Sequence, residues 1–146
     1  GERTPLNDAR IRGQFLHLDH VTDAQHAAQA VMEGVAYAFA DCREALAATG
    51  TTIRRALAIG GGARSAYWLD VLATTLGFPL DVPEQGEFGA ALGAARLGMM
   101  AANGTGAEIA TPPPVARSHE PDPTLAPAFA EGHARYRAAY AALKDL

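Results

Sequence analysis

At 146 residues, the chain is long enough to bury the core of one domain. Hydrophobic residues make up 49% of it and charged residues 19%, which is the balance of a globular protein and excludes a disordered one. A formal charge of −4, with Lys144 as the only lysine, argues against a nucleic-acid-binding face. The single cysteine, Cys42, excludes an internal disulfide and favours a reducing compartment, which we expect to be the cytoplasm.

Neither a secretion signal nor a membrane span is visible in the sequence. The longest apolar-rich run, residues 88–102, contains Arg96 and is shorter than the roughly 20 residues that a bilayer-spanning helix needs. The first five residues read as the middle of a loop, so we expect the chain to be part of a longer protein.

The first predicted elements are a short strand and a long helix. Apolar side chains give residues 13–18 the character of a strand. A helix begins near Asp23, where Thr22 and Gln25 match the capping box that satisfies free amides reciprocally, and Gly50 is its predicted stop. Its apolar residues recur at spacings of three and four, which predicts one stripe made of Ala28, Val31, Met32, Val35, Phe39, Cys42 and Leu46.

A strand, a glycine turn and a second helix come next. Residues 56–59 are four apolar residues in a row, which predicts a central strand of a parallel sheet, buried on both faces. Three glycines follow, and a turn without Cβ atoms can adopt positive φ and let another group approach its backbone. The second helix, residues 65–76, ends at Gly77, and residues 80–82 form a short strand between two prolines.

The glycine turn is the candidate binding site. Free amides at the start of a helix, together with its dipole, favour an anion, so we predict a phosphate or nucleotide cradle. Its residues are Gly60, Gly61, Gly62, Ala63, Arg64 and Ser65. The motif matches neither the P-loop, which needs a lysine, nor the glycine pattern of dinucleotide-binding folds. From the local sequence alone, a tight turn with no ligand stays open as an alternative.

Two further helices and a proline-rich segment complete the chain. The first helix, residues 85–102, is rich in glycine and alanine, and small side chains predict close packing against a neighbour. Residues 105–127 hold six of the nine prolines, which predicts an extended, partly polyproline segment crossing the surface. The last helix, residues 128–146, has an apolar stripe that we expect to dock on the main part of the chain, residues 1–104, or on a neighbouring segment outside this chain.

We predict no metal site in this chain and assign no catalytic residue within it. His17 and His20 are three residues apart, and in an extended segment they point to opposite faces, without a Cys or Glu at ligand spacing. Glu84 and Glu87 are candidates for a carboxylate pair, but solvated acidic residues are common in a loop and in the first turn of a helix.

Several stretches together resemble a known protein family. They are Gly1-Glu-Arg-Thr-Pro5, the loop ending in Arg12-Gly13, Ile59-Gly-Gly-Gly-Ala-Arg-Ser65 and Gly89-Ala-Ala-Leu-Gly-Ala-Ala95. In this order and spacing they look like the C-terminal part of the FGGY carbohydrate kinases. A family signature is approximated by residues 13–33, although His17 and Ala27 stand where a glycine and a larger apolar residue are usual. The resemblance covers residues 1–104 well and the tail loosely.

The resemblance implies an α/β fold of the actin-like, ribonuclease H-like ATPase class, here an incomplete lobe with mainly parallel strands and packed helices. In such kinases this lobe holds ATP, and Gly61, Gly62 and Ala63 match the positions that approach the nucleotide. The family transfers the γ-phosphoryl group to a sugar hydroxyl, using Mg²⁺ and an aspartate base. D-xylulose is the expected acceptor, and the expected product is its 5-phosphate.

The family's aspartate base normally lies in a Gly-Asp motif, and this chain contains no such dipeptide. We therefore expect the base, most of the sugar site and most of the Mg²⁺ ligands outside it, which would leave the chain alone inactive. The alternatives are a kinase for gluconate or ribulose, a non-catalytic actin-like nucleotide-binding module, and a packing domain with an empty turn. A homodimer is a further expectation.

Overall fold

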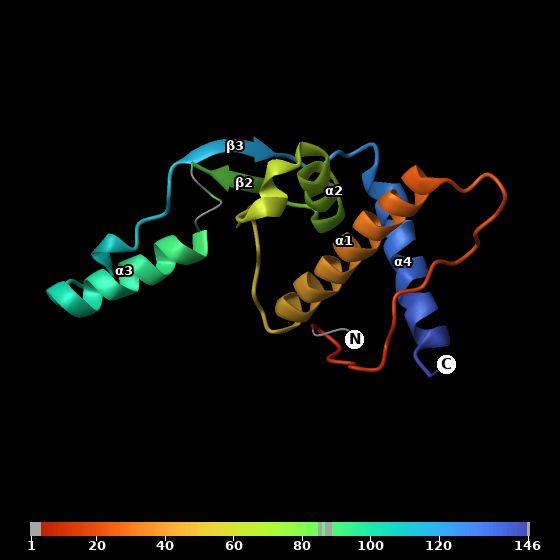
Figure 1. Cartoon of the computed structure of the whole chain (residues 1–146), viewed down its shortest axis with the longest axis horizontal. Coiled ribbons are helices and arrows are strands. Elements are labelled where there is room, and N and C mark those ends of the chain that lie inside the picture. The colour runs from red at the N-terminus through yellow and green to blue at the C-terminus, as the bar shows by residue number, and fades with distance from the viewer. Residues whose placement is uncertain (1–3, 85, 87–88, 146) are drawn as a thin grey trace.

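The computed structural model describes residues 4–84, 86 and 89–145, and Figure 1 shows the path of the chain. Its helices and strands are α1 (Ala24–Ala48), β1 (Ala56–Leu57), the 3-10 helix η1 (Gly61–Arg64), α2 (Ala66–Leu76), β2 (Leu80–Pro83), α3 (Gly89–Asn103), the 3-10 helix η3 (Ala107–Ile109), β3 (Val115–His119) and α4 (Ala126–Leu143). Among the described residues, no helix is both long and apolar enough to cross a membrane.

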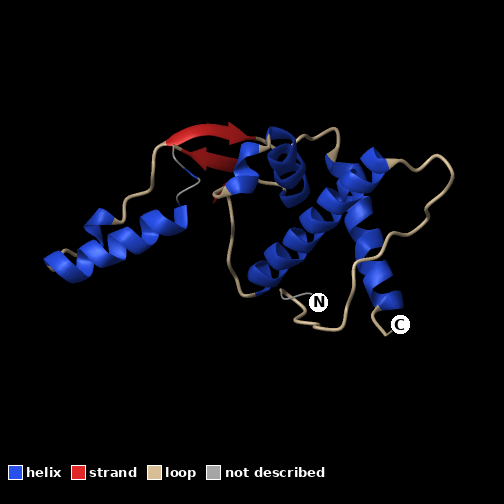
Figure 2. Cartoon of the chain, in the orientation of Figure 1, coloured by secondary structure: helices blue, strands red, loops and turns tan. Residues whose placement is uncertain are grey.

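The strands form a small mixed sheet in the order β1-β2-β3, drawn in red in Figure 2. β1 pairs with β2 in parallel, with Ala56 opposite Leu80, and β2 pairs with β3 in antiparallel, with Leu80 opposite His119. Helix α2 covers the sheet, and α1 and α4 pack against α2 and against each other. The core lies between α2 and β2, where Leu69, Leu72 and Leu80 are buried.

The predicted central place of residues 56–59 is wrong for the described part of the sheet, because β2 is the central strand. Only two residues of that run form a strand, and β1 has β2 as its neighbour on one side alone. Leu57 and Ile59 are consequently about half exposed, at 47% and 53%. The second neighbour of β2 is β3, which comes from the segment expected to be extended and proline-rich.

The strand predicted for residues 13–18 does not form. The segment has no regular secondary structure, and Phe15, Leu16 and Leu18 are exposed. A strand needs a partner for its backbone amides and carbonyls, and no described segment pairs with this one.

Helix α1 buries a different face from the predicted stripe. Val31, Val35, Phe39 and Leu46 are exposed, whereas the buried residues of α1 are Ala36, Tyr37 and Ala40. The two alanines let α2 approach closely, and the ring of Tyr37 contacts three aromatic side chains of α4, which are Phe129, His133 and Tyr136. Periodicity finds an apolar stripe, but it does not say which face the neighbouring helices cover.

Two details of α1 are also settled by contacts. Its N-cap is Asp23 rather than Thr22, because the Asp23 carboxylate accepts hydrogen bonds from the amides of Gln25 and His26 at 2.9 and 3.0 Å. The Thr22 hydroxyl instead donates to Asp19. The predicted stop is confirmed, since Gly50 follows the C-cap with a φ of 87°.

Helix α3 stands apart from the rest of the described chain, as Figure 1 shows. Its main described neighbour is η3, and none of its residues is buried. The predicted packing of its small residues is therefore absent here, except at Gly89, where an added Cβ would lie 2.7 Å from Cδ1 of Ile59. The start predicted at residue 85, and Glu87, lie outside the described residues.

Candidate functional site

The glycine turn joins β1 to α2 through η1, so α2 does not begin at once after the glycines. Gly60 precedes η1 with φ 85° and ψ −174°, a combination that only glycine adopts readily. Gly61 and Gly62 lie within η1 and have no positive φ. Of the three glycines of the turn, Gly60 is therefore the one whose backbone needs a positive φ. Ser65 then caps α2, where its Oγ accepts a hydrogen bond from the Trp68 amide at 3.2 Å.

Hydrogen bonds within and around the turn engage some of its backbone groups and leave two amides without a partner among the described residues. The Gly60 carbonyl accepts from the Ala63 amide at 3.1 Å, and the Gly62 carbonyl accepts from the Ser65 amide at 3.2 Å. The Gly60 amide donates to the carbonyl of Gly86 at 3.1 Å. Among the described residues, the amides of Gly61 and Gly62 make no hydrogen bond, and both residues are exposed. The Ala63 amide is already committed within the turn.

A cavity of about 230 Å³ lies against this turn. Its lining comes from the turn, from the end of β2 and from the beginning of β3, and consists of Gly60, Ala63, Arg64, Val82, Pro83, Glu84, Gly86, Ala116 and Arg117. The cavity therefore lies beyond the carboxyl ends of the two parallel strands, because the turn follows β1 and Glu84 follows β2. Open α/β sheets bind their ligands at this edge.

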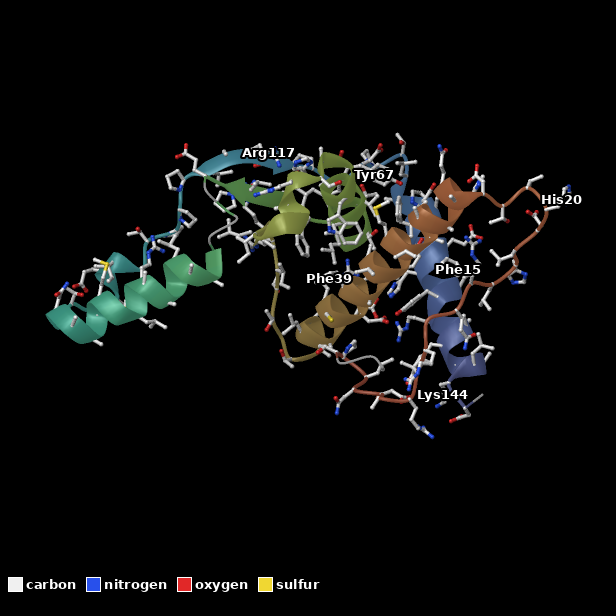
Figure 3. All side chains as sticks on the ribbon, viewed as in Figure 1. Phe15, His20, Phe39, Tyr67, Arg117 and Lys144 are labelled. Atoms are coloured by element: carbon white, nitrogen blue, oxygen red, sulfur yellow. The ribbon has the colours of Figure 1, made fainter. Side chains whose placement is uncertain are left out.

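The charged side chains of the cavity favour an anion. Arg64 and Arg117 line it together with one carboxylate, Glu84. Arg117 also contacts the turn itself, because its Nη2 donates to the carbonyl oxygen of Ala63 at 2.7 Å. Figure 3 shows Arg117 on the ribbon of β3. No local pattern points to this residue, since the contact spans 54 positions and depends on the pairing of β3 with β2.

The turn has room for a ligand at the two inner glycines. An added Cβ at Gly61 would meet nothing within 4 Å, and one at Gly62 would lie 3.6 Å from the indole of Trp68, an ordinary van der Waals distance. The absence of side chains at these positions is therefore not required by packing within the described chain. It keeps the space in front of the two amides open.

A larger cavity, about 430 Å³, lies between α1, α4 and the N-terminal segment. Its charged residues are Asp41, Glu44 and Arg137. Both carboxylates have partners, because Arg137 Nη1 donates to Glu44 at 2.7 Å and Asp41 lies 2.8 Å from His133 Nε2 and 3.7 Å from Arg137 Nε. Among its described lining residues, the one cation is therefore engaged with carboxylates, and the cavity has no excess of positive charge that would attract an anion.

No set of three or more His, Cys, Asp or Glu side chains with the geometry of a metal site occurs among the described residues. In the described part of the chain, Glu84 is the one carboxylate that lines the cavity at the turn. A Mg²⁺ ion bound with a nucleotide needs only one or two carboxylates besides the phosphate oxygens and water. The cavity could supply at most a small part of such a site.

Comparisons show that the chain is similar to known proteins along its length. The model of the FGGY family of carbohydrate kinases, C-terminal domain, matches residues 1–102. A xylulose kinase of Escherichia coli (strain K12) is 40% identical over 148 residues, covering 100% of this chain and 31% of that protein. A gluconokinase of Bacillus subtilis (strain 168) is 32% identical over 108 residues, covering 69% of this chain and 20% of that protein.

The crystal structure of a xyloylose kinase from Brucella ovis matches with a TM-score of 0.90 and 51% identity, covering 99% of this chain and 30% of that one. The predicted fold class, an actin-like α/β lobe, is confirmed by this likeness. The chain spans about a third of the length of the xylulose kinase of E. coli. None of these matches tests the residues of the glycine turn.

Proposed function

Because the chain belongs to the FGGY family of carbohydrate kinases, we propose that it forms the ATP-side part of a sugar kinase. The observation that carries the proposal is the turn at the carboxyl edge of the sheet. There the amides of Gly61 and Gly62, which make no hydrogen bond among the described residues, belong to the same turn as Gly60, Ala63 and Arg64. Those three residues line a cavity together with Arg117, whereas Gly61 and Gly62 are exposed and are not part of its lining. Amides and guanidinium groups together match the phosphate groups of ATP or ADP.

In the proposed reaction the acceptor hydroxyl of the sugar attacks the γ-phosphorus of ATP. A bond forms between the sugar oxygen and phosphorus, the bond from the γ-phosphorus to the bridging oxygen breaks, and ADP leaves. The hydroxyl proton passes to a base outside this chain. The part played by this chain is to hold the phosphates with the turn amides and to offset their charge with Arg64 and Arg117. Mg²⁺, held mainly by the nucleotide and by residues outside this chain, would neutralise developing charge.

The proposed sugar is D-xylulose, because several relatives along the whole chain are named xylulose kinases. Gluconate is the second candidate, and the gluconokinase relative is the specific observation that favours it. The proposal includes a cytoplasmic location, in keeping with the single cysteine. A homodimer remains a prediction, which the mass of the full-length protein in solution would test.

The test is a kinetic comparison of acceptors with the full-length protein. ADP formation is measured with ATP and Mg²⁺ in the presence of D-xylulose, gluconate or ribulose, and kcat/KM is compared. We expect D-xylulose to give the highest value. A preference for gluconate would replace the proposed substrate but keep the kinase. ADP binding without phosphoryl transfer to any of the three sugars would contradict the kinase and favour a nucleotide-binding module.

A further inference from the structure

Arg117 is the one residue of β3 that hydrogen-bonds to the glycine turn among the described residues. Resting on the proposed function, we propose that Arg117 is a positioning residue of the nucleotide site, which fastens the turn and presents its remaining N–H groups to the phosphates. The geometry of the contact, the chemistry of the guanidinium and the charge of the cavity each support this role.

The contact holds the end of η1. The Ala63 carbonyl belongs to the last turn of this short helix, where carbonyl groups lack partners within the helix. Arg117 Nη2 supplies that partner at 2.7 Å, and a cationic side chain at the C-terminal end of a helix is favourable. Ala63 itself is 7% exposed and belongs to the hydrophobic core. Arg117 therefore ties β3 to a buried residue of the same short helix that contains Gly61 and Gly62.

The same guanidinium has further donors to offer. Arginine carries five N–H groups in a planar fork, and one of its nitrogens, Nη2, is engaged with Ala63. The side chain lines the cavity, so its other donors are available at the surface where a phosphate would lie. Bidentate binding of phosphate oxygens is the arrangement that suits this group best.

The charge of the cavity depends on this residue. Among the described lining residues, Arg64, Arg117 and Glu84 are charged, and together they carry one net positive charge. Loss of Arg117 would leave one arginine facing one carboxylate, with no net attraction for an anion. Because the Arg117 guanidinium is partly exposed to solvent, salt should screen its charge and weaken its contribution to anion binding.

The experiment titrates full-length wild type and Arg117→Ala with ADP by calorimetry, at low and at high salt. We expect the variant to bind ADP about tenfold more weakly than wild type at low salt. The difference in affinity between the two proteins should decrease as the salt concentration rises. D-xylulose binding should stay within about twofold of wild type. Arg135→Ala is the matched control, because it removes the same charge from an exposed surface pair with Glu131 on α4 and should leave ADP binding unchanged.

Three results would overturn the proposal. The first is a folded Arg117→Ala variant that binds ADP as tightly as wild type does. The second is a loss of ADP affinity that is the same at every salt concentration, which would mean that the residue only holds the turn in place. If Arg117→Ala does not fold, Arg117→Gln, which keeps an N–H donor without the charge, is measured in its place with the same expectation. The third result is a failure of the wild-type protein to bind ADP. This result would contradict the proposed function itself, and it would be seen before any variant is compared.

Discussion

Arg55 holds Asp81 from a position just before β1, with its Nη1 2.8 Å from both carboxylate oxygens of Asp81. Asp81 lies in the central strand and is 2% exposed. On its other side, the Ser118 hydroxyl of β3 donates to the same carboxylate. The buried carboxylate thus joins β2 to both of its flanking segments.

The first prediction follows from the acidity of this group. The hydrogen bonds from Ser118 and Arg55 lower the pKa of Asp81 below its ordinary value of 3.8. A lowered pKa in the folded state means that the ionised form stabilises the fold above about pH 4, and that this stabilisation is lost as the pH falls through the folded pKa. Asp81→Asn should lower the thermal midpoint by several degrees at pH 7, and the difference from wild type should shrink in acid. Asp145→Asn, at an exposed position, is the control. A difference that is the same at pH 7 and pH 3 would contradict the prediction.

The second prediction concerns Gly60 and its backbone. Because Gly60 has φ 85° and ψ −174°, alanine there should cost about 1–3 kcal/mol of unfolding free energy. Gly61→Ala, in the same turn but with an ordinary φ and open space around its Cβ, should change stability by less than about 0.5 kcal/mol. Urea unfolding of both variants measures the difference, and equal stabilities would show that the turn does not require this geometry.

The third prediction separates binding from folding at Gly62. A Cβ there meets only the Trp68 ring at 3.6 Å, so Gly62→Val should fold. Its side chain would occupy the space before the free amides, and ADP binding should fall about tenfold, or about 1.4 kcal/mol, while sugar binding is kept. Calorimetric titrations of the full-length protein with ADP and with sugar, alongside the thermal midpoint, provide the test. A well-folded variant that binds ADP like wild type would remove the turn from the site.

The fourth prediction compares a buried and an exposed apolar side chain. Leu69 is 1% exposed in the core, and Leu69→Ala should cost about 2–5 kcal/mol. Phe39 is 49% exposed on α1 (Figure 3), and Phe39→Ala in this chain should cost much less, about 1 kcal/mol or below. Denaturant unfolding gives both values. In the full-length protein we expect Phe39→Ala to lower the unfolding free energy by more than it does in this chain, since exposed apolar patches mark interfaces. An equal loss in the two proteins would show that no other segment covers this face of α1.

Local signals in the sequence predicted the elements that local interactions determine. Gly50 and Gly77 end their helices with positive φ, and residues 80–82, between Pro79 and Pro83, lie in the strand β2, which includes Pro83. Ser65 and Asp23 supply helix caps through contacts within three residues, although the cap of α1 was predicted one position too early.

Features that depend on distant partners could not be found in this way. The apolar stripe of α1 looks suitable for burial, yet Ala36 and Ala40 are buried instead, because α2 packs on that side. Residues 13–18 have the composition of a strand without a described partner. For the candidate site, the glycine turn was visible as a motif, whereas Arg117 became visible only through the pairing of β3 with β2.

The place of β3 in the chain has a consequence for the order in which the protein is made. The ribosome releases the glycine turn first, and residues 115–119 emerge only after all of α3. A nascent chain that has emerged as far as Gly104 has the turn and the central strand, but lacks the strand and the arginine that close the cavity. If the turn binds a nucleotide as proposed, the affinity would therefore reach its full value only once the C-terminal segment has left the exit tunnel and paired with β2.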